Sequence, residues 1–157
     1  DLTTLLGKVH GLVLNYEEAE QYTGHKNPVT AGRKILELGP TFVVIKKGEH
    51  GALLFHENDG ELVTFFCPAL PLEEVVDPTG AGDTFAGGFI GHVARCGSTD
   101  FETLKEAIVV GSALASFTCE SFGTEGIRAV SEEMMEGRMQ AFRNMMSWQT
   151  SVVGAAV

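Results

Sequence analysis

A glycine-rich heptad in the middle of the chain constrains the fold most. The heptad DPTGAGD occupies residues 77–83 and directly follows the short apolar run 74–76. Downstream of it, Phe85, Phe89 and Val93 recur at the four-residue spacing that is typical of one helix face. The sequence therefore predicts a strand, a tight loop and the start of a helix, in that order.

Such a loop suits an anion. The first turn of a helix has unpaired N–H groups and the positive end of the helix dipole, and Gly80 and Gly82 let a ligand approach the backbone closely. These features predict a phosphate site. The loop ends in a carboxylate, Asp83, which suggests a base that takes a proton from an attacking hydroxyl. The alternative is a strand-to-helix turn in which Asp83 only caps the helix.

The heptad resembles the second signature of the ribokinase-like family of sugar and nucleoside kinases, also called the phosphofructokinase-B type. That signature is an acidic residue, one variable position and then Thr-Gly-Ala-Gly-Asp, and it stands intact here. The resemblance implies that Asp83 is the catalytic base. It also implies that the amides of Gly80, Ala81, Gly82 and Asp83 form the anion hole for the phosphoryl group transferred from ATP.

A second pair of polar residues, Asn15 and Glu18, follows the predicted strand 11–15. This Asn-x-x-Glu tetrad resembles the Mg²⁺ and phosphate motif of the same family, in the same order along the chain. The resemblance implies that Glu18 holds Mg²⁺ through water and that Asn15 hydrogen-bonds a phosphate oxygen. The alternative is that Asn15 simply caps the next helix. The family also places a monovalent cation, such as K⁺, near the positions of Asp77 and Thr79.

The segment KKGEHG, residues 46–51, resembles the family's strand end and x-Gly-x-x-Gly turn near the nucleotide. Lys46 could neutralise a β- or γ-phosphate, and Gly48 lies in the turn expected to bind the nucleotide. Lys47 is expected to point to the other face, because strand neighbours alternate. The alternative is a hairpin turn flanked by solvated lysines. Relatives often carry an arginine in the loop aligned with residues 117–126, and this chain has Glu-Ser-Phe-Gly there, which weakens the case for the monovalent cation.

The composition of the chain limits the kinds of partner that it is expected to bind. The net charge of −10 argues against a nucleic-acid surface, and no apolar run is long enough for a membrane span. No signal peptide opens the chain, and three widely spaced cysteines fit reduced thiols, so we expect a cytoplasmic protein with a small-molecule substrate. Family members are about twice as long, which makes this chain resemble their C-terminal half. An isolated half is expected to lack most of the substrate site and to expose an edge that favours homo-oligomers.

The fold class expected is α/β, a layered ribokinase-like fold with helices on a mostly parallel sheet and a small β-meander, incomplete at its N-terminal side. Residues 1–148 form the nucleotide-binding and catalytic portion, and 149–157 a tail. Helices are expected at 1–6, 17–22, 28–38, after 83, at 101–117 and at 131–146, strands at 11–15, 41–47, 52–55 and 61–66, and a loop at 119–126.

The function expected is ATP-dependent phosphorylation of a sugar hydroxyl. A nucleoside kinase of the same family and a non-catalytic nucleotide-binding module are the alternatives. A dinucleotide oxidoreductase is disfavoured because no strand, G-x-G-x-x-G and helix unit is present.

Overall fold

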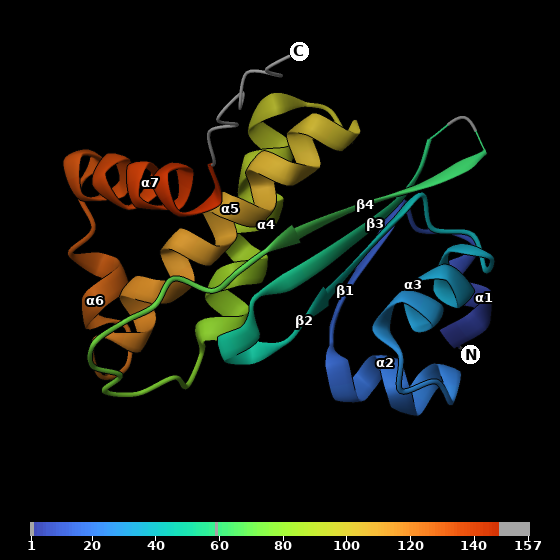
Figure 1. Ribbon diagram of the computed structural model, residues 1–157, viewed down its shortest axis with the longest axis horizontal. Helices are drawn as coiled ribbons and strands as arrows, with labels where there is room; N and C mark the ends of the chain where they lie inside the picture. The colour runs from blue at the N-terminus through green and yellow to red at the C-terminus, as the bar shows by residue number, and fades with distance from the viewer. Residues whose placement is uncertain (1, 59, 148–157) are drawn as a thin grey trace, which may run out of the picture.

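The computed structural model describes residues 2–58 and 60–147. Figure 1 shows helices on both faces of one sheet. The helices and strands, in chain order, are α1 (Leu2–Leu6), β1 (Gly11–Asn15), α2 (Tyr16–Thr23), α3 (Pro28–Leu36), β2 (Phe42–Lys46), the 3₁₀ turn η1 (Gly48–His50), β3 (Ala52–Asn58), β4 (Glu61–Cys67), α4 (Ala81–Cys96), α5 (Phe101–Cys119), α6 (Glu125–Arg128) and α7 (Glu132–Met146).

The sheet has four strands in the order β1-β2-β3-β4. β1 and β2 are parallel, and β2, β3 and β4 form an antiparallel meander. The layered α/β class with a small meander is therefore confirmed, and the parallel part within the described residues is the β1–β2 pair. In that pair Asn15 lies opposite Lys46. The two strands therefore present these polar side chains at the same carboxyl edge of the sheet, where open α/β sheets bind ligands.

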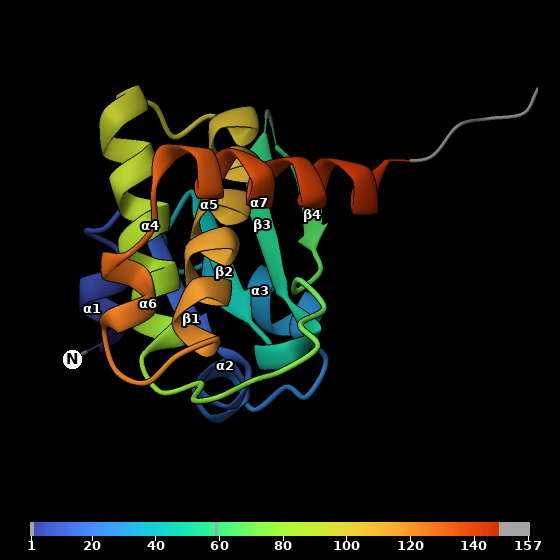
Figure 2. The ribbon, with the colours of Figure 1, turned by 90° about the vertical axis from the view of Figure 1, so that its left-hand side faces the viewer.

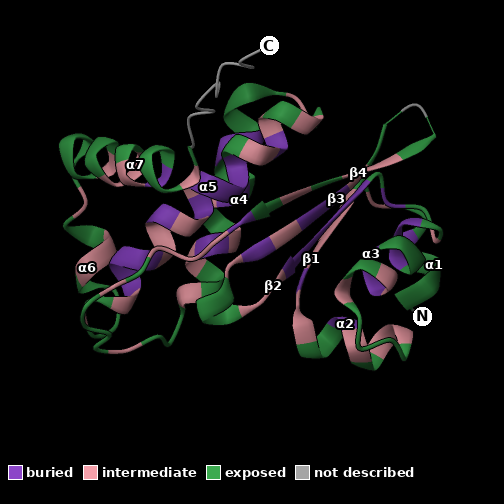
Figure 3. Cartoon of the chain, viewed as in Figure 1, coloured by how far each residue is buried: buried purple, intermediate pink, exposed green. Residues whose placement is uncertain are grey.

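The apolar run of β2 serves two cores. Val44 packs with α4, α5 and α7 on one face of the sheet. Val43 and Ile45 pack with α2 and α3 on the other face. All three side chains are fully buried, which explains why this strand shows no polar alternation. Figure 3 shows the buried residues concentrated along β2 and β3 and along the inner sides of the helices.

α4 and α5 pack closely because of glycine. A methyl group at Gly111 of α5 would lie 2.7 Å from the carbonyl oxygen of Phe85 in α4. A methyl group at Gly88 of α4 would lie 3.1 Å from the Cα of Gly111. Small residues at both positions let the two backbones meet. This packing fixes the position of the α4 N-terminus, where the heptad ends.

Two predicted elements were wrong. Residues 74–76 form no strand: Val75 and Val76 are exposed, and the Val76 N–H donates to the Cys119 carbonyl instead of to a strand. An apolar pair in a short loop carries the same local signal as a strand. The predicted loop 119–126 overlaps the single-turn helix α6, which is too short to show a helical period. The predicted tail 149–157 lies outside the described residues. None of the helices in the described part of the chain could span a membrane.

Candidate active site

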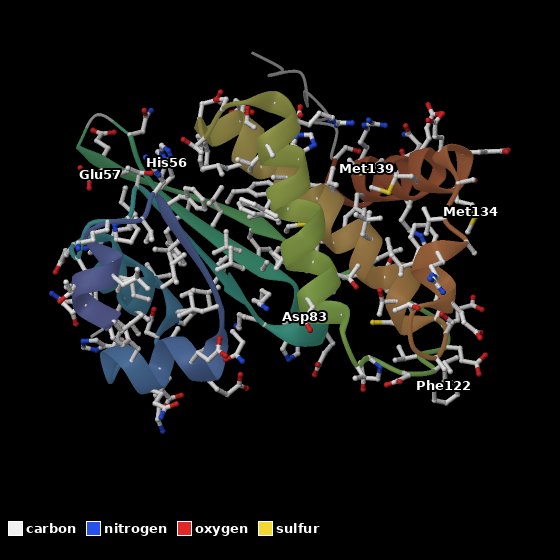
Figure 4. All side chains as sticks on the ribbon, turned by 180° about the vertical axis from the view of Figure 1, so that it is seen from behind. His56, Glu57, Asp83, Phe122, Met134 and Met139 are labelled. Carbon is white, nitrogen blue, oxygen red and sulfur yellow. The ribbon has the colours of Figure 1, made fainter. Side chains whose placement is uncertain are left out.

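The candidate site lies where the carboxyl ends of β1 and β2 meet the N-terminus of α4. Figure 4 shows Asp83 at that end of α4, beside the turn that follows β2. A methyl group added at Gly82 would lie 3.2 Å from the Lys46 ammonium nitrogen, so the lysine head group is directly against the glycine-rich loop. The fold thus brings together Lys46 and the heptad, which the sequence analysis assigned to one site.

The first turn of α4 has free N–H groups. Gly80 is the N-cap residue with a φ of 83°, a left-handed conformation that suits glycine, and no side chain caps the helix. The Thr84 N–H makes the first helical bond, to the Gly80 carbonyl, and the Ala81 N–H donates to the Pro78 carbonyl. Among the described residues, the amides of Gly80, Gly82 and Asp83 have no protein acceptor. Three donors and the helix dipole therefore remain available to an anion.

Asp83 is exposed at the start of the helix, next to these amides. The helix has no other acidic residue in its first turn. A carboxylate beside a cluster of N–H donors can accept a proton from a hydroxyl held at the same place. No side-chain hydrogen bond caps α4 at Gly80, and Asp83 lies in the first turn, where a carboxylate also interacts favourably with the helix dipole.

The loop before α4 is held by its own residues and by α5. The Asp77 carboxylate accepts a hydrogen bond of 2.9 Å from the Thr79 N–H, which lowers the pKa of Asp77. The Val76 and Asp77 N–H groups donate to the Cys119 carbonyl, at 2.8 and 3.2 Å. The Thr118 hydroxyl donates to that of Thr84, at 3.0 Å. The end of α5 thus fixes the loop from both sides of the heptad.

Thr84, Thr118 and Cys119 were missed by the sequence analysis. Their contacts join segments far apart in the chain, and one of them uses a backbone carbonyl that any residue would supply. No sequence pattern could have found them.

Lys46 and Lys47 point in different directions, as strand alternation predicts. Lys46 is half-buried beside Gly82, whereas the Lys47 ammonium lies 5.7 Å from the centre of the Tyr16 ring. The two lysines have the same charge and neighbouring positions. Only Lys46 adds positive charge next to the free amides of α4, and Lys47 serves as its natural control.

Asn15 and Glu18 form a capping box. The Asn15 side chain accepts from the Glu18 N–H at 2.7 Å, and Glu18 accepts from the Asn15 N–H at 2.8 Å. The structural alternative for Asn15 is therefore present at the start of α2. Asn15 still lies at the carboxyl edge of the sheet, opposite Lys46, and Glu18 follows it in the first turn of α2. The capping role leaves the Asn15 amide nitrogen and the second Glu18 oxygen for other contacts.

We expect Asn15→Ala to lower the free energy of unfolding by about 1 kcal/mol, because the first turn of α2 loses its cap. Urea unfolding monitored by circular dichroism measures this change. Asn27→Ala is the matched control, since Asn27 caps α3 with two similar hydrogen bonds but lies away from the heptad. If Asn15 also serves the phosphates, only its variant weakens ATP binding.

The residues present fit a phosphate group better than a self-contained metal site. No group of three or more metal-binding side chains occurs in residues 2–58 and 60–147. Glu18 supplies a single exposed carboxylate, which is compatible with a Mg²⁺ ion that keeps its water and is held mainly by phosphates. Asp77 has a lowered pKa and stays ionised at neutral pH, as a cation neighbour requires.

The loop after α5 has no arginine at residues 120–123, where relatives often carry one, but an arginine of α7 reaches this loop. Arg138 of α7 forms an ion pair of 2.7 Å with Glu120 and lies over the ring of Phe117, 4.0 Å from its centre. The Arg138 side chain is mostly buried. This contact fixes the loop that begins at Glu120 to α7.

Comparison with known proteins decides the family. The model of the pfkB family carbohydrate kinases matches residues 1–129. The chain belongs to this family. A cytidine kinase of Thermococcus kodakarensis is 41% identical over 96 residues, which are 60% of this chain and 33% of that protein. An ATP-dependent 6-phosphofructokinase of Thermoanaerobacterium thermosaccharolyticum is 31% identical over 78% of this chain and 35% of that protein.

Solved structures of pfkB-like kinases share the fold. Aminoimidazole riboside kinase from Salmonella enterica, complexed with its riboside and an ATP analog, gives a TM-score of 0.74 at 25% identity. The match covers 88% of this chain and 44% of that chain. The recognition of the ribokinase-like family is therefore confirmed. The chain spans about a third of the curated relatives and less than half of the solved structures that it matches.

Proposed function

We propose that this chain is the nucleotide-binding and catalytic portion of a cytoplasmic kinase that transfers the γ-phosphoryl group of ATP to a hydroxyl of a sugar or nucleoside. One observation carries the proposal: the Lys46 ammonium, the free amides of Gly80, Gly82 and Asp83, and the Asp83 carboxylate converge at one helix N-terminus. Donors for an anion and an acceptor for a proton are the two requirements of phosphoryl transfer to an alcohol.

Each residue has a distinct role in this proposal. The amides of Gly80, Gly82 and Asp83 donate to the oxygens of the transferred group, and Lys46 offsets the negative charge of those oxygens; the Ala81 amide, which the sequence analysis included, already donates to the Pro78 carbonyl. A carboxylate oxygen of Asp83 takes the proton of the attacking hydroxyl. Asn15 donates to a phosphate oxygen from across the sheet edge, and the turn at Gly48 borders the nucleotide. ATP, when bound, supplies the phosphoryl group, with Mg²⁺ neutralising its oxygens.

Two cation contacts complete the proposal. Glu18 would hold a water of the Mg²⁺ shell through its free oxygen. Asp77, whose carboxylate is kept ionised by the Thr79 N–H, and Thr79 would hold a monovalent cation such as K⁺. Replacing K⁺ by a large organic cation in the buffer tests the second contact.

We expect Lys46→Met to weaken ATP binding about tenfold, because a charge-assisted contact to phosphate of about 1.4 kcal/mol is lost. Isothermal titration calorimetry of the whole chain with ATP and Mg²⁺ measures the dissociation constant. Lys47→Met removes the same charge from the next residue and should leave the constant nearly unchanged. If both changes weaken ATP binding equally, only the overall charge of the chain matters, and the assignment of Lys46 to the phosphate site is contradicted.

A non-catalytic nucleotide-binding module is the second candidate, because the free amides at the start of α4 and the Lys46 ammonium would bind a phosphate whether or not a hydroxyl is activated there. A coupled ADP-release assay with a panel of sugars and nucleosides separates the two. Turnover with any member supports the kinase and identifies the substrate class. ATP binding without turnover across the panel supports the module.

A further inference from the structure

Arg138 of α7 holds the end of α5 through two contacts at once. Its guanidinium donates to one Glu120 carboxylate oxygen at 2.7 Å and more weakly to the other at 3.5 Å. The same group lies over the Phe117 ring, 4.0 Å from its centre. Only 16% of the Arg138 side chain is exposed, so solvent screens these contacts less than it screens a surface ion pair. Figure 2 shows α7 crossing α5.

The two residues between these contacts hold the glycine-rich heptad. The Thr118 hydroxyl donates to that of Thr84, directly after the heptad. The Cys119 carbonyl accepts from the N–H groups of Val76 and Asp77, where the heptad begins. Of the four consecutive residues 117–120, the outer two therefore contact α7 and the inner two contact the segments on either side of the anion site.

The end of α5 needs a positive charge that its own sequence does not supply. Residues 116–119, its last turn, are Ser-Phe-Thr-Cys, and its C-cap residue is Glu120. A carboxylate at the C-terminus of a helix lies at the negative end of the helix dipole, which is unfavourable. Arg138 supplies the compensating charge from another helix. Without it we expect the last turn of α5 to loosen, which would release the Cys119 carbonyl from the heptad.

We propose that Arg138 is a positioning residue of the candidate active site. It holds the last turn of α5 in the place from which Thr118 and Cys119 fix the heptad, and so keeps the free amides at the start of α4 aligned for a phosphate. α7 lies outside residues 1–129, the part of the chain that matches the family model, so the family assignment gives it no role. The effect on ATP rests on the kinase proposal, whereas the effect on the heptad does not.

Hydrogen exchange of individual amides, measured by NMR on the isotope-labelled chain, tests the proposal. In Arg138→Met we expect the Val76 and Asp77 amides to exchange about tenfold faster, because the end of α5 opens more easily. Amides of β2 should change less. Arg143→Met is the matched control, since Arg143 is an exposed arginine of the same helix whose side chain contacts Gln140 of α7. It should leave both exchange rates as they are in the unchanged chain.

Two further variants separate charge from packing. Arg138→Lys keeps the positive charge but loses the second hydrogen bond and the planar contact with the Phe117 ring, so its exchange rates should lie between those of the unchanged chain and Arg138→Met. Adding Glu120→Gln to Arg138→Met removes the uncompensated carboxylate from the end of α5 and should slow the exchange again. A loss of packing alone would not be repaired in this way.

Calorimetry with ATP and Mg²⁺ measures the consequence for the site. We expect Arg138→Met to raise the dissociation constant about fivefold and Arg143→Met to leave it unchanged. A local rise in exchange without a loss of ATP affinity overturns the link between Arg138 and the anion site. If the unchanged chain binds no ATP, the kinase proposal fails, while the exchange rates still decide whether Arg138 positions the heptad.

The exchange data can also overturn the proposal directly. Unchanged rates at Val76 and Asp77 in a folded variant of Arg138 would do so, and Arg138→Lys decides the matter if circular dichroism shows that Arg138→Met does not fold. An equal rise at all amides would do so as well, because Arg138 would then act only on the stability of the whole chain.

Discussion

Asp83→Asn is expected to lower turnover by about 10²–10⁴-fold, the usual contribution of a general base. The change keeps the size and shape of the side chain and removes its ability to accept the hydroxyl proton. ATP affinity should stay the same or increase modestly, because a negative charge next to the phosphate site is lost. ADP release with the substrate found in the panel measures turnover, and calorimetry measures ATP binding. Turnover equal to that of the unchanged chain would exclude Asp83 as the base.

The same variant has a readout that does not need turnover. Asp83 lies beside the free amides of Gly82 and Asp83 itself, so its charge repels any anion held there. We therefore expect Asp83→Asn to bind inorganic phosphate more tightly than the unchanged chain. Glu74→Gln is the control, because it removes an exposed carboxylate from the segment before the heptad. Weaker phosphate binding in Asp83→Asn would place the anion elsewhere.

Local signals in the sequence were enough for most of the fold. Asn27 followed by Pro28 begins α3 as predicted, and Gly24 ends α2 in the left-handed conformation. Asp100 begins α5, the helix predicted at 101–117, by accepting from the Thr103 N–H. These features depend on residues within one helical turn of each other. Propensity and hydrogen-bonding chemistry therefore determine them without help from the rest of the chain.

The contacts within the candidate site could be established only from the tertiary structure. The sequence placed the heptad and Lys46 in one site only through a family resemblance, and the structure adds that the Lys46 head group lies against Gly82. The bond between Thr118 and Thr84 spans 34 residues and leaves no local pattern. The tetrad from Asn15 to Glu18 fits both a helix capping box and the family's phosphate motif. The sequence pattern alone therefore could not distinguish these two roles.

Gly51→Ala is expected to lower the free energy of unfolding by about 3 kcal/mol or more. Gly51 has a φ of 93°, and a methyl group there would lie 2.1 Å from the Cys67 carbonyl oxygen and 2.7 Å from the Cα of Pro68. Both neighbours are backbone atoms, so no side chain can rotate to make room. For a chain of this size the loss corresponds to about 6–12 °C in Tm, which differential scanning calorimetry resolves.

Gly48→Ala in the same turn is the matched control. Gly48 also has a positive φ, 55°, but a methyl group there meets no atom within 4 Å. Its cost should be about 1 kcal/mol, from the backbone conformation alone. The difference in unfolding free energy between the two variants measures the contact of Gly51 with the end of β4, which holds the turn after Lys46 in place. If this contact also positions Lys46, Gly51→Ala weakens ATP binding more than Gly48→Ala does. Equal losses of Tm would show that the chain relieves the contact by moving, and that the turn is not fixed by β4.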